Sequence, residues 1–135
     1  MSNNEKRIMD EQIEELSNQI ISALKEIRVN VVKEEYILQE MIAKEFENAN
    51  ISYKKEYKLG PRKRIDFFLE PGIGIEVKKG KPNKRTTIKQ LKRYTEVEKI
   101  KMLILVVERN LSIPEKINGV KCLSFGVNRN WGIAL

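Results

Sequence analysis

The chain has 135 residues, with 26 lysines and arginines against 19 aspartates and glutamates, so its formal net charge is +7. It contains no histidine and one cysteine, which excludes Ser-His-Asp and Cys-His catalysis, histidine-dependent metal sites, two-histidine ribonuclease chemistry, disulfide scaffolds and cysteine metal clusters. Carboxylates and lysine remain for any hydrolytic chemistry, and the length fits one domain with a real core.

The N-terminal segment predicts a helix from about Glu5 to Arg28. It carries an apolar stripe with nearly heptad spacing, made of Met9, Ile13, Leu16, Ile20, Leu24 and Ile27. Either this helix packs on its own domain, or residues 1–30 form a separate helix for homodimerisation or for docking a partner protein, with the main domain over 31–135. The polar start and the lack of a long apolar run lead us to expect a cytoplasmic protein with no membrane partner.

A second helix is expected from Val32 to Asn48, capped by Asn30. Glu35 falls in the same angular sector as the expected buried face, and Glu45 is the competing acid in that sector. A carboxylate on an apolar face needs a cation or a metal, although a first-turn glutamate can also be stabilised by the helix dipole. The buried face is expected to consist of Leu38, Met41, Ile42, Phe46 and Ala49.

A first strand is expected from Ile51 to Leu59, followed by a β-hairpin over Arg64–Lys79. The turn is Glu70-Pro71-Gly72. Alternation predicts that the side chains of Ile65, Phe67 and Leu69 share one sheet face and that Asp66 points to the other. Ile75 and Val77 are likewise expected to lie opposite Glu76 and Lys78.

The hairpin turn predicts the partners of the two hairpin acids. With a three-residue loop, cross-strand partners have numbers that sum to about 142, so Asp66 faces Glu76. Like charges in this position repel each other, and Mg²⁺ relieves the repulsion because it prefers one or two carboxylates with water and phosphate oxygens. Lys78 would then lie beside the metal and a bound phosphate.

Downstream of the hairpin, an irregular basic loop contains Gly80 and Pro82. A helix is expected to start at Thr86 or Thr87 and to run to about Glu98, with Gln90 and Tyr94 one turn apart on one face. Further strands are expected over 102–107, buried on both faces, and over 120–127, with a short helical turn around 114–116.

The combination of Asp66, Glu76-Val77-Lys78 and Gln90-x-x-x-Tyr94 resembles the PD-(D/E)XK nuclease superfamily, in particular its RecB-like branch. Glu35 resembles the glutamate of the first helix in that superfamily. The resemblance covers roughly residues 31 to 110. It implies an α+β, restriction-endonuclease-like αβββαβ core, in which a mixed central sheet is flanked by helices, with the N-terminal helix added.

The resemblance also implies roles for these residues. Asp66, Glu76 and the backbone carbonyl of Val77 would bind Mg²⁺, for which Mn²⁺ can substitute, and Glu35 would hold a water or a second ion. Lys78 would orient the attacking hydroxide, and Gln90 would bridge the attacking water and a phosphate oxygen. Tyr94 would contact the next phosphate or a base, or else pack between helix and sheet.

The implied function is metal-dependent hydrolysis of phosphodiesters, with DNA as the expected substrate, by an endonuclease or structure-selective nuclease of repair, recombination or defence. The alternative is a nucleic-acid- or partner-binding module with weak or no catalysis on a nuclease-like fold. Positive residues gather over 54–64 and 78–101, which favours a polyanionic partner over a merely solvated surface. The expected phosphate-binding residues are Lys79, Lys81, Lys84, Arg85, Lys89 and Arg93.

Overall fold

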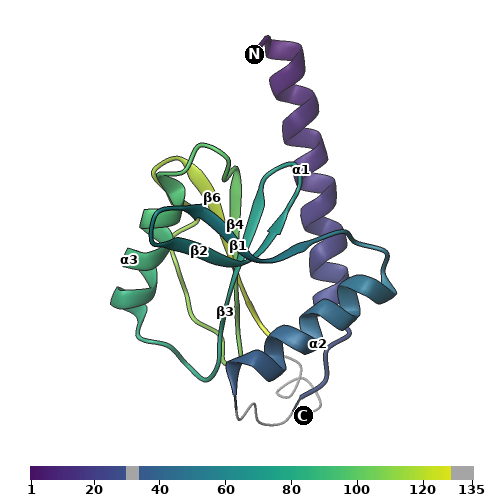
Figure 1. Cartoon of the computed structure of the whole chain (residues 1–135), viewed down its shortest axis with the longest axis vertical. Helices are drawn as coiled ribbons and strands as arrows, with labels where there is room; N and C mark the ends of the chain where they lie inside the picture. Colours follow the sequence, from purple (N-terminus) through teal and green to yellow (C-terminus); the bar gives the residue numbers. More distant parts are fainter. Residues whose placement is uncertain (30–33, 129–135) are drawn as a thin grey trace.

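Three helices and a six-stranded mixed sheet make up the part of the chain that the computed structural model describes, residues 1–29 and 34–128 (Figure 1). The expected α+β class is therefore confirmed. The elements in chain order are α1 (Asn3–Leu24), α2 (Glu35–Asn48), β1 (Lys54–Gly60), β2 (Lys63–Leu69), β3 (Ile73–Lys78), α3 (Lys84–Thr95), β4 (Met102–Val107), β5 (Lys116–Ile117) and β6 (Val120–Gly126).

The strand order in the sheet is β1-β2-β3-β4-β6-β5. The pairs β1–β2, β2–β3 and β5–β6 are antiparallel, whereas β3–β4 and β4–β6 are parallel. All six residues of β4 are buried, because the strand lies between two neighbours and both faces of the sheet are covered. This confirms the strand expected over 102–107.

The two faces of the sheet have separate hydrophobic cores. On one face, Phe67, Leu69 and Ile75 pack with residues of α1 and α2, including Leu24 and Phe46. On the other face, residues of α3 pack against the sheet, and this smaller core includes Ile65, Phe68, Leu91, Tyr94, Ile100 and Leu103. Figure 1 shows α3 on one side of the sheet and α2 on the opposite side. A site formed by side chains of both β3 and α3 must therefore lie on this face of the sheet.

Much of the stripe on α1 packs against the chain itself. Ile13, Ile20 and Leu24 are buried, as is Ile27 just beyond the helix, while Met9 and Leu16 are partly buried against the same core. The first turns of α1 extend beyond the sheet (Figure 1). The division of the chain into a separate N-terminal helix over 1–30 and a main domain over 31–135 stays a prediction. No helix among the described residues is long and apolar enough to cross a membrane.

Several element ends differ from expectation. The helix α2 begins at Glu35, and Ala49 is exposed because the helix ends before it; the expected cap Asn30 lies outside the described residues. The helix α3 begins two residues early, because the Asn83 side chain accepts a hydrogen bond from the Thr86 backbone N–H at 2.9 Å. The expected helical turn at 114–116 is wrong, since Lys116 and the next residue pair with β6.

The register of the hairpin follows the prediction. In the observed pairs Phe67–Ile75, Phe68–Gly74 and Leu69–Ile73, the two residue numbers add up to the predicted 142. The turn occupies the three expected residues.

Ile65 was expected on the same face as Phe67 and Leu69, and this is wrong. Its side chain packs together with Phe68 in the core on the α3 face. Gly74 makes room for it, because a Cβ there would come within 2.5 Å of Ile65 Cδ1. The regular pleat is therefore interrupted at Asp66, between Ile65 and Phe67. On the neighbouring strand, Glu56 has φ 52°, in the left-handed region.

Candidate active site

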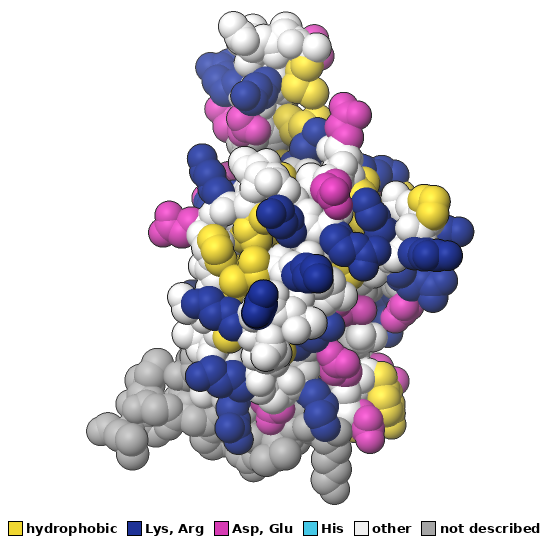
Figure 2. All heavy atoms as spheres, turned by 90° about the vertical axis from the view of Figure 1, so that its left-hand side faces the viewer, with side chains coloured by type: hydrophobic (Ala, Val, Ile, Leu, Met, Phe, Trp, Pro, Cys, Tyr) yellow, Lys and Arg dark blue, Asp and Glu magenta, His cyan; other side chains and the backbone are white. Residues whose placement is uncertain are grey.

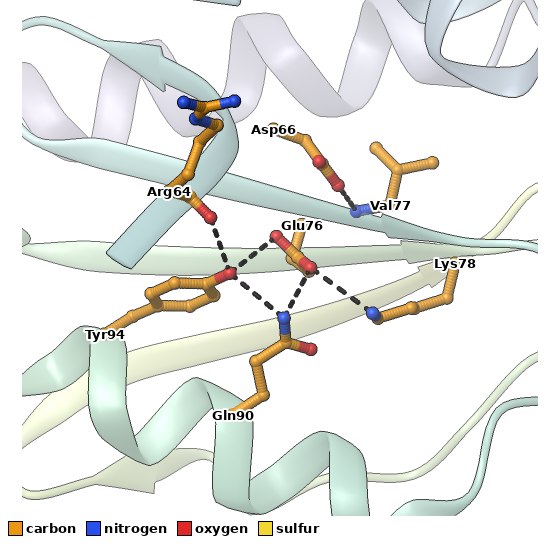
Figure 3. A network of polar contacts seen from close by, with 7 residues as sticks. All are labelled: Arg64, Asp66, Glu76, Val77, Lys78, Gln90 and Tyr94. Carbon is orange, nitrogen blue, oxygen red and sulfur yellow. Dashed lines mark hydrogen bonds and ion pairs between the residues drawn. The ribbon is translucent and has the colours of Figure 1, made fainter. Parts of the chain in front are cut away.

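Asp66 uses its side chain to extend the contact between β2 and β3. Its Oδ2 accepts a hydrogen bond from the backbone N–H of Val77 at 2.7 Å (Figure 3). The backbone pairing of the two strands ends at Phe67 and Ile75, so the aspartate side chain takes the place of the next backbone partner. This bond lies where the pleat is interrupted, and it anchors one carboxylate beside β3.

Glu76 is buried on β3, with 5% of its surface exposed, and protein donors reach both of its oxygens. Its Oε1 accepts from the Tyr94 hydroxyl at 3.1 Å, and its Oε2 accepts from Gln90 Nε2 at 2.9 Å. Lys78 Nζ lies 3.4 Å from the same Oε2. The hairpin glutamate and lysine thus meet the glutamine and tyrosine of α3 (Figure 3).

Tyr94 joins α3 to both strands of the hairpin. Its hydroxyl accepts from Gln90 Nε2 at 3.1 Å and lies 2.9 Å from the carbonyl oxygen of Arg64. A hydroxyl has one proton, so it donates to either this carbonyl or the Glu76 carboxylate at a given moment. Burial, followed by the neighbouring Glu76 charge, raises the pKa of Tyr94, which keeps the hydroxyl protonated.

The pKa values of both hairpin carboxylates are raised, although Lys78 lies close to them. Burial raises the pKa of Glu76 to about 7, the Asp66 charge adds to this effect, and Lys78 opposes it. Burial also raises the pKa of Asp66, and the nearby charges of Glu56 and Glu35 act in the same direction, against the Val77 N–H and Lys78. A cation placed between such groups would favour their ionised forms.

The donor set fits a hard divalent cation. Asp66, Glu76 and the Val77 carbonyl supply only oxygen donors, and Mg²⁺ in proteins is held by one or two carboxylates that leave room for water and phosphate. Within residues 1–29 and 34–128, no three histidine, cysteine, aspartate or glutamate side chains gather closely enough to form a metal site on their own. A cation here would therefore depend on water or substrate oxygens.

The structure distinguishes the two candidate acids of α2. Glu35 is the first residue of the helix, is half-buried, and lies near enough to Asp66 for its charge to raise the aspartate pKa. Glu45 instead lines a cavity between α1 and α2, together with Glu15 and Glu26. Of the two acids, Glu35 is therefore the one whose charge reaches Asp66, and among the described residues it is not part of a three-acid cluster.

The expected phosphate-binding residues are all exposed, and they lie on α3 and on the loop before it. Lys81 and Lys84 line one shallow cavity, whereas Arg93 lines another together with Gln90 and Tyr94. In the space-filling view that faces α3, lysine and arginine side chains are spread over the surface (Figure 2). Exposed cations therefore lie on the α3 side of the molecule (Figure 2), the side on which Gln90 and Tyr94 reach Glu76.

Two features of the site region were missed from the sequence. Buried Glu108 accepts a hydrogen bond from the Gly80 N–H at 2.7 Å and so holds the start of the basic loop. Lys58 and Arg62, at the end of the β1–β2 hairpin, line the same cavity as Gln90. The signal for these cations was the positive cluster over 54–64, but no motif connected it with α3.

Comparison with protein-family models, with curated proteins and with solved structures found no match for this chain.

Proposed function

We propose that this protein is a metal-dependent nuclease that hydrolyses phosphodiester bonds, with DNA as its substrate. The observation that carries the proposal is the pair of neighbouring carboxylates, Asp66 and Glu76, with raised pKa values and with Lys78 at 3.4 Å from Glu76. The element order from α2 to β4 supports it, because helix, three strands, helix and strand is the order expected for a PD-(D/E)XK core.

Asp66, Glu76 and the carbonyl of Val77 would hold Mg²⁺ or Mn²⁺. When bound, the ion would neutralise phosphate charge and lower the pKa of water. Glu35 would orient a water from the side of α2. The raised carboxylate pKa values support this assignment, because the ionised pair is unfavourable until a cation compensates it.

Three further side chains would act on the phosphate. The ammonium of Lys78 would stabilise the negative charge that develops on the phosphoryl oxygens and would orient the attacking hydroxide. Gln90 has both a donor and an acceptor, so it would bridge the attacking water and a phosphate oxygen. Tyr94 would donate its one proton either to Glu76, which it would hold in place, or to a neighbouring phosphate.

Exposed cations on α3 and its preceding loop would supply affinity without reading sequence, because phosphate contacts position a nucleic acid but carry no base information. We therefore propose an endonuclease or a structure-selective nuclease of repair, recombination or defence. Recognition of a long sequence would need a second copy or a partner protein, with the projecting start of α1 as a contact surface.

The test is incubation of the purified chain with supercoiled, linear, single-stranded and branched DNA in Mg²⁺, in Mn²⁺ or in EDTA. The proposal expects cleavage with either metal and none in EDTA. Nicked or linearised plasmid would indicate an endonuclease, progressive shortening an exonuclease, and cleavage of branched DNA alone a structure-selective enzyme. A matched Asp66→Asn protein must lose the activity, which separates it from a contaminating nuclease.

One observation favours the alternative, a nucleic-acid-binding or partner-binding module. Both oxygens of Glu76 accept hydrogen bonds from protein groups, so a metal ligand would share them with Tyr94 and Gln90. A module of this kind would bind DNA in EDTA and in Mg²⁺ with equal affinity and would leave every substrate intact.

A further inference from the structure

A cavity of about 370 Å³ lies between α3 and the end of the β1–β2 hairpin. Its lining contains the cationic side chains of Lys58, Arg62, Lys63, Arg64 and Arg93 and no acidic residue. Such a lining attracts a polyanion, because the field of several like charges is focused within a concavity. The cavity is separate from the loop cations Lys81 and Lys84, which line a different hollow.

Part of this charge is already balanced. Lys63 lies 3.8 Å from Glu96, and Arg64 lies 4.0 Å from Glu56, in partly exposed ion pairs. Exposed pairs of this kind contribute little and are readily exchanged for another anion. The remaining cations of the lining are Lys58, Arg62 and Arg93.

The hairpin end is held on α3 by two contacts. Arg93 Nη2 donates to the carbonyl of Arg62 at 3.4 Å, and the Tyr94 hydroxyl lies 2.9 Å from the carbonyl of Arg64. Arg62 itself has φ 58°, and the β1–β2 register shifts between Lys58 and Gly60. These features shape the turn into one wall of the cavity.

The cavity adjoins the carboxylate site through two shared side chains. Gln90 and Tyr94 both line it, and the same two side chains donate to the oxygens of Glu76. An anion in the cavity would therefore lie next to one bound at the carboxylate pair. Such an arrangement suits successive phosphates of a single strand.

We propose that this cavity binds a second phosphate of the nucleic acid, so that one strand runs along α3 from the basic loop to the β1–β2 hairpin. The proposal rests on the proposed function for the identity of the strand. With a rise of about 1.5 Å per residue, Arg85 and Arg93 are separated by about 12 Å along the helix.

The test is fluorescence anisotropy in EDTA with a labelled 12-nucleotide single strand, over a series of salt concentrations. The variants are Lys58→Gln, Arg62→Asn and both together. Asparagine is chosen because it tolerates the left-handed backbone of Arg62. Lys44→Gln, at an exposed position of α2, is the control with the same loss of charge as either single variant.

The double variant is expected to bind about tenfold more weakly and to lose about 1 to 2 from the slope of log affinity against log salt. The single Lys58→Gln variant should lose about half of this slope, and Lys44→Gln should stay within about twofold of wild type. If the double variant matches Lys44→Gln while circular dichroism shows it folded, the cavity is not a phosphate site.

The same strand with a 5′-phosphate, with a 3′-phosphate and with neither identifies the bound phosphate. A preference for one phosphorylated end that the double variant abolishes would assign the cavity to a terminal phosphate. Equal affinity for all three, with the double variant weaker throughout, would assign it to an internal phosphodiester. Cleavage assays are independent of this result. If the wild type cleaves DNA and the double variant binds as the wild type does, only the cavity proposal is contradicted. If the double variant binds more weakly and the wild type cleaves no substrate, only the proposed nuclease activity is contradicted.

Discussion

Glu76 and Tyr94 are 18 residues apart in the sequence, and the tyrosine hydroxyl lies 3.1 Å from Oε1 of the glutamate. Since Gln90 reaches the other oxygen of the same carboxylate, α3 contacts β3 through polar groups inside an otherwise apolar interface. A buried carboxylate of this kind is oriented on both sides before any ligand binds.

The carboxylate pair is expected to be essential for cleavage. Asp66→Asn and Glu76→Gln each retain shape but remove the charge that would hold Mg²⁺, so cleavage should fall by at least about 10³-fold. DNA affinity in EDTA should stay within about twofold, because exposed cations supply it. Quantitative plasmid nicking and anisotropy on the same samples check both statements. Cleavage at the wild-type rate by either variant would exclude the metal-site assignment.

The metal-free protein is expected to lose stability as the pH rises from about 4.5 to about 7. The pKa of Glu76 is raised to about 7 from 4.5, so the folded state binds its proton more tightly than the unfolded chain does. Its contribution is complete below the lower value and is lost as the pH passes the higher one. The size of the effect is about 3 kcal/mol.

Urea unfolding in EDTA from pH 4 to pH 8 measures this contribution, and Glu76→Gln should flatten the profile. Adding Mg²⁺ should raise the unfolding midpoint at pH 8 and have little effect at pH 5, where protons compete with the cation. A metal-free protein that is equally stable at pH 5 and pH 8 would contradict the raised pKa.

Lys78 is expected to act on the rate of the chemical step. Lys78→Ala should reduce the single-turnover rate by about 10²-fold or more while changing the salt slope by less than about 1, because its charge matters most in the transition state. Gln90→Ala should reduce the rate less, since it removes an orienting amide and no charge. Lys81→Ala, in the basic loop, is the matched control and should weaken binding instead. A Lys78→Ala protein with an unchanged saturated rate would make the hairpin a phosphate-binding surface alone.

The stripe of α1 is expected to stabilise the fold through its later turns. Ile20 is fully buried, so Ile20→Ala should lower the free energy of unfolding by about 2 to 4 kcal/mol. Ile8 is 49% exposed, so Ile8→Glu should leave stability within about 0.5 kcal/mol. Light scattering of the Ile8→Glu protein tests the dimerisation hypothesis: a smaller particle than wild type supports it, and a monomeric wild type contradicts it.

Local patterns predicted the parts of the fold that depend on sequence spacing. The apolar run of β4 and the register of the hairpin follow from continuous hydrophobicity and from turn length. The meeting of Gln90 and Tyr94 follows from their spacing of one helical turn. Ile65 departs from alternation next to Asp66, which bonds to the Val77 backbone, and a tertiary contact of this kind leaves no signal in the spacing of residues.

The position of the hairpin cations Lys58 and Arg62 beside α3 was not predicted, for a different reason. Lys58 and Arg62 are exposed, and the positive cluster over 54–64 favoured a polyanionic partner without indicating which other element they would lie beside. Only the packing of the β1–β2 hairpin on α3 brings them to Gln90 and Tyr94. Their relevance to the site depends on tertiary structure alone.

The hydrogen bond from the Gly80 N–H to Glu108 bears on the thermodynamics of DNA binding. Arg109 N–H also donates to the Gly80 carbonyl at 3.0 Å, so both polar backbone groups of Gly80 are attached to the end of β4. The start of the basic loop is therefore held by hydrogen bonds at Gly80, and the loop ends at the capped first turn of α3. A loop held at both ends loses less conformational entropy when its lysines meet phosphate, so more of their attraction is retained as affinity. Glu108→Ala would remove the hydrogen bond to the Gly80 N–H and loosen the start of the loop. Calorimetry of DNA binding is then expected to give a less favourable binding entropy.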